Sequence, residues 1–467
     1  MINRPPVRRP SSARAPTRST ASRNVLLATM LLLAFALSPR RASASTGDTN
    51  AQAVQKAVNY LAPSVSNWTV NQGCIACHHQ GSALYGLSIA KGTGFTIDMS
   101  ANLGAPFIAQ AIVNDQDSGG SWLWGGPQKL KSSYNLYGIA GYDAFVSTAY
   151  SNNLVKGADW ALTSQSPDGR WVMDFEDGDT AHGDMTTTAR FMVGLAQAIQ
   201  RVDPAKAATY QAAMNKAVSY ITAHKADSSD VSGTGIVYEA AWALIGLKAA
   251  GLADTDPTVQ AIVTDLLARK SNLGYAWGYH PGDGADIFNS GMAIYALCTA
   301  GVPAVGNAAL LSSLTWVNNQ QGSDGTWGSD IYTTFATLGL ACYGDYGVKL
   351  TNAGVVSKVI MPASATPQTA TYTFDLQNHG IINDTYNLTV VGGMPGWTTS
   401  IASPVAVAAG AHTTVTLTVN APANLPAALP VQMTVVATSQ AVSTLTASAR
   451  ITTFTDPPPP TSGDSPA

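Results

Sequence analysis

A short stripe of apolar and small residues recurs six times in this chain, at intervals of about 50 residues. The copies read ALYGL (83–87), LYGI (136–139), FMVGL (191–195), ALIGL (243–247), AIYAL (293–297) and ATLGL (336–340). They end on the anchor residues Leu87, Ile139, Leu195, Leu247, Leu297 and Leu340. A second amphipathic stretch precedes each stripe, which predicts a helical hairpin as the repeating unit. One such hairpin cannot bury its apolar face alone, so six in a row predict an open solenoid or a closed ring.

Residues 1–44 differ in kind from the rest of the chain. They hold eight arginines and no acidic residue, then the apolar run VLLATMLLLAFAL (25–37) and the small residues Ala42-Ser43-Ala44. This order is typical of a secretory signal peptide, and an uncleaved membrane anchor is the competing interpretation. Cleavage near Ser45 leaves 17 basic against 28 acidic residues, a formal charge of −11. We therefore expect an exported protein without a membrane span, and we exclude nucleic acid and anionic lipid as partners.

The pattern changes near residue 350, where helical periodicity ends and alternation begins. YTFDL (372–376), YNLTV (386–390), VTLTV (415–419) and VQMTVV (431–436) place an apolar residue at every second position. Such runs, separated by Gly, Pro and Asn clusters, predict a β-sandwich of immunoglobulin type over residues 351–456. It resembles the bacterial Ig-like modules that are appended to secreted enzymes. The last stretch, 457–467, is Pro-rich and is expected to be disordered.

Two of the helical units carry a glutamine, an Asp-Gly turn and a tryptophan before the stripe. They read KGADWALTSQSPDGRW (156–171) and LTWVNNQQGSDGTW (314–327), and LLARKSNLGYAWG (266–278) fits loosely. These segments resemble the QW repeats of the squalene-hopene cyclase and protein prenyltransferase superfamily. The resemblance covers roughly residues 50–350 and implies an (α/α)6 toroid over residues 45–350, in which six inner helices line a central cavity. The expected fold is thus multidomain, an all-α toroid followed by an all-β sandwich.

The family's catalytic residues are not kept at the matching positions. Where cyclases carry DxDDTA, the chain has DMTTTA (184–189), so Asp184 remains but Thr186 and Thr187 replace the acid that protonates the alkene. Where prenyltransferases hold zinc, the chain has Asp286-Ile287-Phe288 and Asp330-Ile331-Tyr332, without the cysteine or histidine ligands. The thioester segment CGEQ of complement-type relatives is absent too. The resemblance therefore predicts the fold and none of these activities.

The first unit carries GCIACHHQG (73–81) instead, with Cys74, Cys77, His78 and His79. Cys-x-x-Cys-His is the attachment motif of c-type haem, in which two thioethers hold the porphyrin and His78 ligates the iron. Export agrees with that chemistry. The same four side chains could instead hold a transition metal or act as a redox dithiol, and the two cysteines could form a structural disulfide. The sequence leaves the three interpretations open.

In a toroid all inner helices begin at the same mouth. We therefore expect one rim to gather Cys77, His78, His79, His182, Asp184, Asp283, Asp286 and Asp330. A competing role for Asp184, Asp286 and Asp330 is N-capping of their helices. Cys298 and Cys342 follow their stripes at the opposite mouth, where they are either buried thiols or a disulfide between adjacent units.

Two classes of function follow. In the first, the rim site acts as an enzyme or redox centre on a small or apolar ligand in the toroid cavity. In the second, the toroid is a non-catalytic exported binding or structural module, and the Ig-like domain attaches it to a surface or a protein partner. The CxxCHH segment favours the first class, and the missing catalytic acid favours the second.

Overall fold

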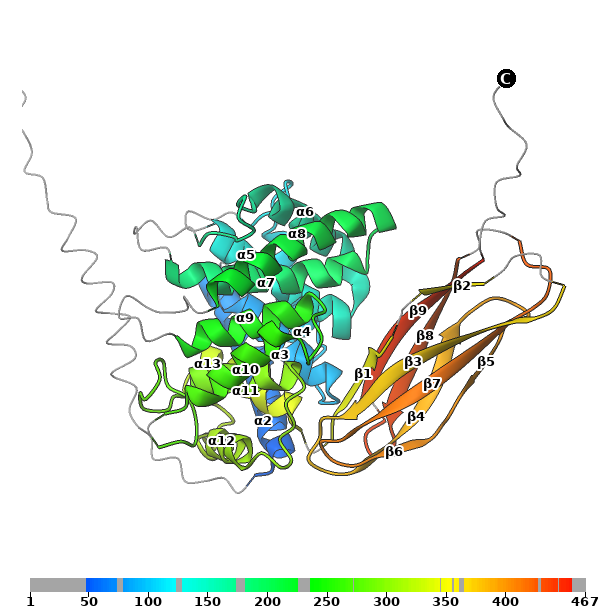
Figure 1. The fold of residues 1–467 in the computed structure, drawn as a ribbon. Helices are drawn as coiled ribbons and strands as arrows, with labels where there is room; N and C mark the ends of the chain where they lie inside the picture. Colours follow the sequence, from blue (N-terminus) through cyan, green and yellow to red (C-terminus); the bar gives the residue numbers. More distant parts are fainter. Residues whose placement is uncertain are drawn as a thin grey trace, which may run out of the picture. The chain divides into compact units, whose positions relative to one another are not determined.

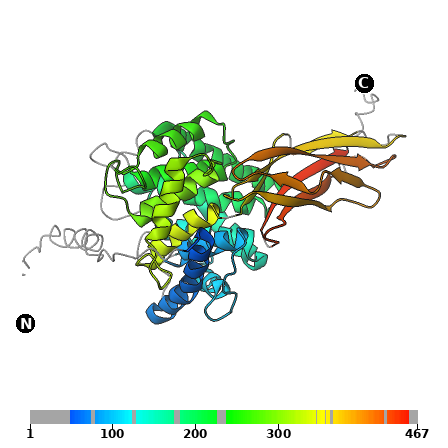
Figure 2. The same ribbon diagram turned by 90° about the horizontal axis from the view of Figure 1, so that it is seen from below.

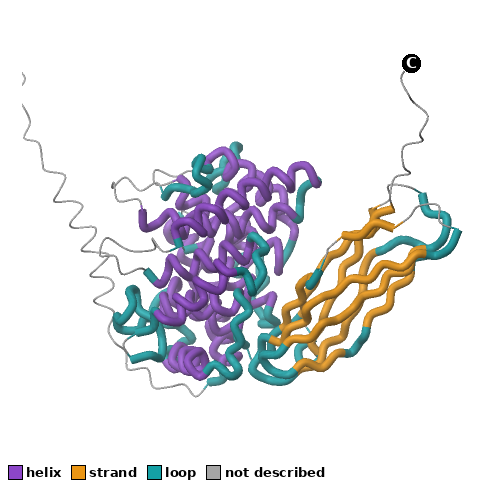
Figure 3. The backbone as a smooth tube through the Cα atoms, in the orientation of Figure 1, coloured by secondary structure: helices purple, strands orange, loops and turns teal. Residues whose placement is uncertain are grey.

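The computed structural model describes residues 48–73, 79–122, 128–173, 181–225, 236–271, 273–344, 346–354, 357–360, 365–426, 430–443 and 445–455. Within these residues the chain forms twelve α-helices followed by nine strands in two sheets (Figure 1). Helix and strand do not alternate along the chain, because all helices precede the first strand. Figure 3 shows the helices in purple and the strands in orange as separate groups. This mixture of helix and strand agrees with the sequence-based prediction. The predicted signal peptide and the Pro-rich tail lie outside the described residues.

The helices fall into two sets. The inner set is buried along nearly its whole surface and comprises α3 (Gln80–Gly92), α5 (Gln128–Phe145), α7 (Ala181–Ile199), α9 (Val237–Ala249), α11 (Ile287–Thr299) and α13 (Asp330–Cys342). The outer set buries a single stripe and comprises α2 (Asn50–Gln72), α4 (Ala105–Asn114), α6 (Ser151–Ser164), α8 (Pro204–His224), α10 (Pro257–Ala268) and α12 (Ala308–Asn319). Each inner helix follows an outer one, so the units are hairpins.

Contacts between the inner helices run in chain order, from α3 to α5 and onward to α13. The last helix, α13, then packs on α3 and on α2, so the series closes on itself. In Figure 2 the yellow-green helices of the last unit lie beside the blue helices of the first. Because each inner helix has neighbours on all sides, it needs small and apolar residues around its whole circumference.

Small residues set the distance between inner helices. A Cβ on Gly81 of α3 would lie 2.3 Å from the Tyr134 carbonyl oxygen of α5, and one on Gly138 would lie 2.6 Å from the Gly81 carbonyl oxygen. Neither backbone can yield, because both belong to packed helices. Gly81, two residues before the first stripe, and Gly138 of the second stripe are therefore required for close packing of α3 on α5.

The loop between the outer and inner helix of a unit is held by its tryptophan. In four units the indole N–H donates to a carbonyl of the outer helix at 2.7–2.8 Å, and the tryptophan backbone N–H donates to a Ser or Thr hydroxyl of the inner helix at 2.9–3.1 Å. The tryptophans are Trp122, Trp171, Trp277 and Trp327. Their hydroxyl partners are Ser132, Thr188, Ser290 and Thr333, each seven positions before the anchor of its unit.

The glutamine of the same loop joins consecutive units. Gln165 Nε2 donates to the carbonyl oxygen of Gly169 in its own loop at 2.8 Å, and to that of Ala213 in the next outer helix, α8, at 2.9 Å. Gln116 and Gln321 make the corresponding pairs of bonds. The second unit therefore makes the same bonds from Gln116 and Trp122 in QDSGGSW (116–122), although it lacks the Asp-Gly turn, and this loop was not predicted.

The strands form two sheets that share one core. The first has the order β1 (Val348–Asn352), β3 (Gln368–Asn378), β7 (His412–Ala421), β5 (Thr398–Ile401); the second has the order β2 (Ser357–Ile360), β9 (Thr446–Thr455), β8 (Pro430–Ser439), β4 (Asp384–Gly392), β6 (Val405–Val407). Every pairing is antiparallel except that of β2 with β9. Alternate residues of each sheet, such as Phe374 and Val435, are fully buried in a common apolar cluster. The alternation read from the sequence thus corresponds to one buried and one exposed face.

The structure also bears on two other expectations, the state of the last two cysteines and the absence of a membrane span. Cys298 of α11 and Cys342 of α13 form a disulfide, which decides between the two states left open for them. Of the helices that the structure describes, none combines the length and the apolar composition of a membrane span.

Candidate functional site at the opening of the first inner helix

In the first unit, the CxxCHH segment takes the place of the glutamine–tryptophan loop. Gln72 ends α2, and the sixth residue after it is His78, where three other units have tryptophan six residues after glutamine. Cys74, Cys77 and His78 lie outside the described residues. His79, the residue before α3, is described and shows how the end of this segment is held.

The His79 ring is fixed on two sides. Its Nε2 lies 2.8 Å from Oδ2 of Asp330, the first residue of α13, and its ring stacks on Trp68 of α2 with the centroids 4.6 Å apart. The side chains of His79 and Asp330 are 18% and 11% exposed. Since α13 belongs to the last unit and α2 to the first, the imidazole lies where the series of helices closes. It is therefore oriented by packing and by a carboxylate together.

The Asp330 carboxylate collects several donors. Ser64 Oγ donates to Oδ1 at 2.9 Å, and the Tyr60 hydroxyl adds a further hydrogen bond. Burial raises the pKa of Asp330, but the hydrogen bonds from His79, Tyr60 and Ser64 outweigh it and hold the pKa below its usual value. Asp330 is therefore a permanent carboxylate partner for the imidazole. Its expected N-cap role was wrong: Ser329 caps α13 through its hydroxyl, because Asp330 already lies inside the helix.

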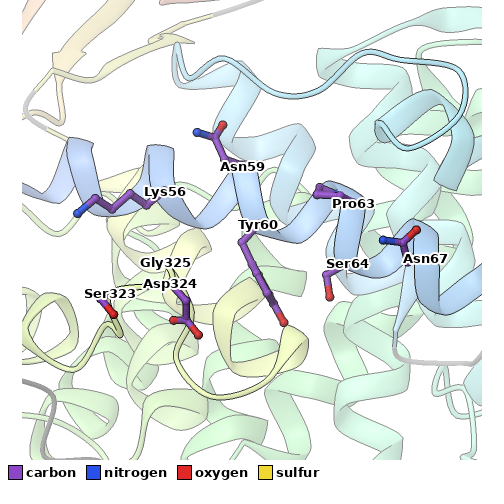
Figure 4. A pocket seen from close by; sticks show the side chains of 9 residues that line it. All are labelled: Lys56, Asn59, Tyr60, Pro63, Ser64, Asn67, Ser323, Asp324 and Gly325. Atoms are coloured by element: carbon purple, nitrogen blue, oxygen red, sulfur yellow. The ribbon is translucent and has the colours of Figure 1, made fainter.

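A shallow groove of about 590 Å³ borders this cluster on the side of α2. It is lined by Lys56, Asn59, Tyr60, Pro63, Ser64, Asn67, Ser323, Asp324 and Gly325. Figure 4 shows Tyr60 and Ser64 projecting from the same side of α2, with the loop of Asp324 facing that helix. Ser64 therefore lines the groove and also donates a hydrogen bond to Asp330, which is not itself a lining residue.

The other rim aspartates have structural partners. Asp184 lies in the first turns of α7 and is not an N-cap, which corrects that expectation; it accepts from Arg170 Nη1 at 3.0 Å and from the Met173 backbone N–H at 2.6 Å. Burial raises the pKa of Asp184 despite these donors. Asp286 does cap its helix, accepting from the Asn289 backbone N–H at 2.8 Å, and burial raises its pKa as well.

The predicted rim cluster is not brought together as a set. His182 lies in the first turn of α7, and its side chain is outside the described part. Asp283 pairs with its loop neighbour His280, 3.1 Å away. Over the residues that the structure describes, no three His, Cys, Asp or Glu side chains are close enough to hold a metal. Of the rim residues, His79 and Asp330 are the pair in direct contact among those described.

The protein's own aromatic side chains occupy the interior of the inner set. Tyr85 and Tyr295 share a hydrogen bond of 2.8 Å between their hydroxyls, and Tyr137 packs on both Tyr85 and Trp242. All four are at most 7% exposed. Burial raises the pKa of Tyr85 to about 12, so this hydroxyl stays protonated. A ligand in the middle of the helices would have to compete with this packing.

The chain matches no model of a known protein family, and no curated protein is similar enough to count as a relative. The assignment of function therefore depends on the site itself.

Proposed function

We propose that the chain is an exported protein built from an (α/α)6 toroid and an Ig-like β-sandwich, and that it binds a transition metal at the toroid mouth. The fold proposal is supported by the closed order of inner-helix contacts and by the repeated glutamine–tryptophan loops. The sandwich is supported by two sheets over one core. The basic, apolar and small-residue segments of residues 1–44 support export.

The observation that carries the metal site is the His79–Asp330 contact of 2.8 Å. Histidines that bind metals commonly donate their other ring N–H to a carboxylate, which fixes the tautomer and raises the basicity of the ligand. Asp330 is suited to this role because its hydrogen bonds keep it ionised. Cys74, Cys77 and His78 supply the thiolate and imidazole ligands that zinc and copper prefer.

A covalently bound haem is the second candidate, and the Cys74-x-x-Cys77-His78 spacing is the observation that favours it. In that case the protein would carry electrons, and His79 with Asp330 would orient the neighbouring His78. Cyclisation of an alkene is not proposed. The residues matching the family's acid, Thr186 and Thr187, are buried hydroxyls that cannot protonate a hydrocarbon.

The test is metal analysis and an absorption spectrum of full-length protein purified from an exporting, haem-maturing host. We expect stoichiometric zinc or copper in the wild type and none in Cys77→Ser. Asp330→Asn should weaken metal affinity by about 10–100-fold, as loss of an orienting carboxylate does. The matched control is Asp286→Asn, which removes a buried carboxylate at another inner-helix opening and should leave the metal content unchanged.

The possible outcomes separate the two candidates. A haem spectrum that disappears in Cys77→Ser would replace the metal proposal with the haem one. Wild-type protein that holds neither metal nor haem would contradict both proposals, and a non-catalytic binding module would then be the remaining function.

A further inference from the structure

One position of the repeat, five residues before the anchor, is charged in a single unit. Five positions before the six anchors stand Ser82, Tyr134, Arg190, Trp242, Met292 and Phe335. Arg190, on α7, is 1% exposed. Its guanidinium carbon lies 3.8 Å from the ring centroid of Tyr134 and 4.9 Å from that of Trp242, on the two neighbouring inner helices.

The hydrogen bonding of this guanidinium is incomplete. Arg190 Nη2 donates to the hydroxyls of Tyr134 at 2.9 Å and Tyr238 at 2.5 Å, whereas Nε and Nη1 are buried without a partner. No carboxylate among the described residues forms an ion pair with it. An arginine stays protonated in a protein, so within the described part of the chain this is a buried charge without a counter-ion.

Two further donors at this place are also unpaired. Thr187 Oγ1 lies one turn before Arg190 on α7, and Trp242 Nε1 belongs to the indole that packs on the guanidinium. Residues three apart on a helix share a face, so Thr187 lies on the same side of α7 as Arg190. Cation–π contacts contribute about 0.5–2 kcal/mol each and offset only part of the cost of a buried, unpaired charge.

We propose that a small inorganic anion binds inside the inner helices against Arg190, with Thr187 and Trp242 as additional donors. The unpaired groups on Arg190, Thr187 and Trp242 are N–H and O–H donors beside a positive charge, and such a set suits an anion. Arg190, Thr187 and Trp242 are at most 1% exposed, so the ligand must be small, and chloride is the anion that we propose. The anion would be a structural ion that neutralises Arg190, and it is independent of the site at His79.

The first experiment measures thermal unfolding of the full chain by circular dichroism, with chloride exchanged for gluconate at constant ionic strength. Gluconate is too large for the packed interior. A ligand that binds only the folded state should raise the Tm by about 2 °C for each tenfold increase in chloride above its dissociation constant. Arg190→Met should abolish this dependence, because the variant has no charge to neutralise.

The matched control is Lys270→Met. Lys270 is another partly buried cation, 4.5 Å from the ring centroid of Trp277, but its Nζ donates to the Ala309 carbonyl oxygen and to Ser313 Oγ. Its loss should leave the chloride dependence of the Tm intact. A second measurement does not depend on any variant: crystals grown in bromide should show an anomalous peak beside Arg190 Nε or Nη1. A wild-type Tm independent of chloride, or no bromide at that place, would overturn the proposal.

Discussion

One buried glutamine, Gln321, hydrogen-bonds the last unit of the helical series to the first. Gln321 is fully buried and its Nε2 donates to the Gly325 carbonyl oxygen at 2.9 Å and to the Ala53 carbonyl oxygen of α2 at 2.8 Å. In Gln321→Ala both bonds disappear. A buried neutral hydrogen bond contributes about 1 kcal/mol, so the variant should lose about 2 kcal/mol of unfolding free energy.

The matched variant is Gln165→Ala, which removes the same two kinds of bond, to Gly169 and Ala213, between consecutive units in the interior of the series. Urea unfolding of both variants and of the wild type measures the effect. With an m-value of about 3 kcal/mol/M, each midpoint should move down by about 0.7 M. In an open series Gln321 would lie at a free edge, and its replacement would cost less than about 0.5 kcal/mol. A loss confined to Gln165→Ala would therefore refute closure.

Three other predictions concern charge, crosslinking and autonomy. Asp330→Asn should lower the unfolding free energy most above about pH 4 and progressively less at lower pH. The pKa of Asp330 is lowered in the folded state, so its carboxylate stabilises the fold until protonation removes the charge. Asp286→Asn should show the opposite trend. Because burial raises the pKa of Asp286, the unfolding free energy of this variant should increase relative to that of the wild type as the pH rises past about 4. Urea unfolding between pH 3 and 7 tests both variants. Replacing Cys298 and Cys342 by alanine removes a crosslink between residues 44 apart and should lower the unfolding free energy by up to about 4 kcal/mol relative to the disulfide-bonded wild type; the reduced wild type is the control and should lose a similar amount. A fragment of residues 348–455 should fold alone, and a coil-like circular dichroism spectrum would contradict this.

The repeat in the sequence predicts the helices well because each inner helix buries its whole surface, which restricts its residues to small and apolar types. The anchors Leu87 and Leu340, for example, are fully buried. The glutamine–tryptophan loop of the second unit was missed because Gln116 and Trp122 enclose Asp-Ser-Gly-Gly-Ser, which lacks the Asp-Gly turn. The hydroxyl seven positions before the anchor, Ser132 in that unit, is the signal that would have found it.

The geometry of the site was harder to predict. The spacing of the repeats places residues at the same end of the inner helices, but it does not determine which side chains are in contact. The sequence put Asp184, Asp286 and Asp330 in equivalent positions, yet their partners differ. Asp184 pairs with an arginine from its own loop, Asp286 caps its helix, and Asp330 binds His79 from a unit more than 250 residues away in the chain. The last contact depends on closure of the series. No local pattern contains that information.

The first and fourth units lack the glutamine–tryptophan loop that the second, third and sixth units have, and the first unit alone carries two cysteines in its place. That substitution indicates where function lies. A glutamine–tryptophan loop makes four hydrogen bonds, which together stabilise a unit by about 4 kcal/mol. Gln72 is exposed, and no tryptophan follows it in the loop. Two other contacts compensate in part for the hydrogen bonds that the first unit lacks: Trp68 stacks on His79, and Gln80 forms a buried hydrogen bond of 2.9 Å with Thr69. Natural proteins break a local rule mainly at functional sites, so the cysteines and histidines that displace the loop are best explained by what they bind.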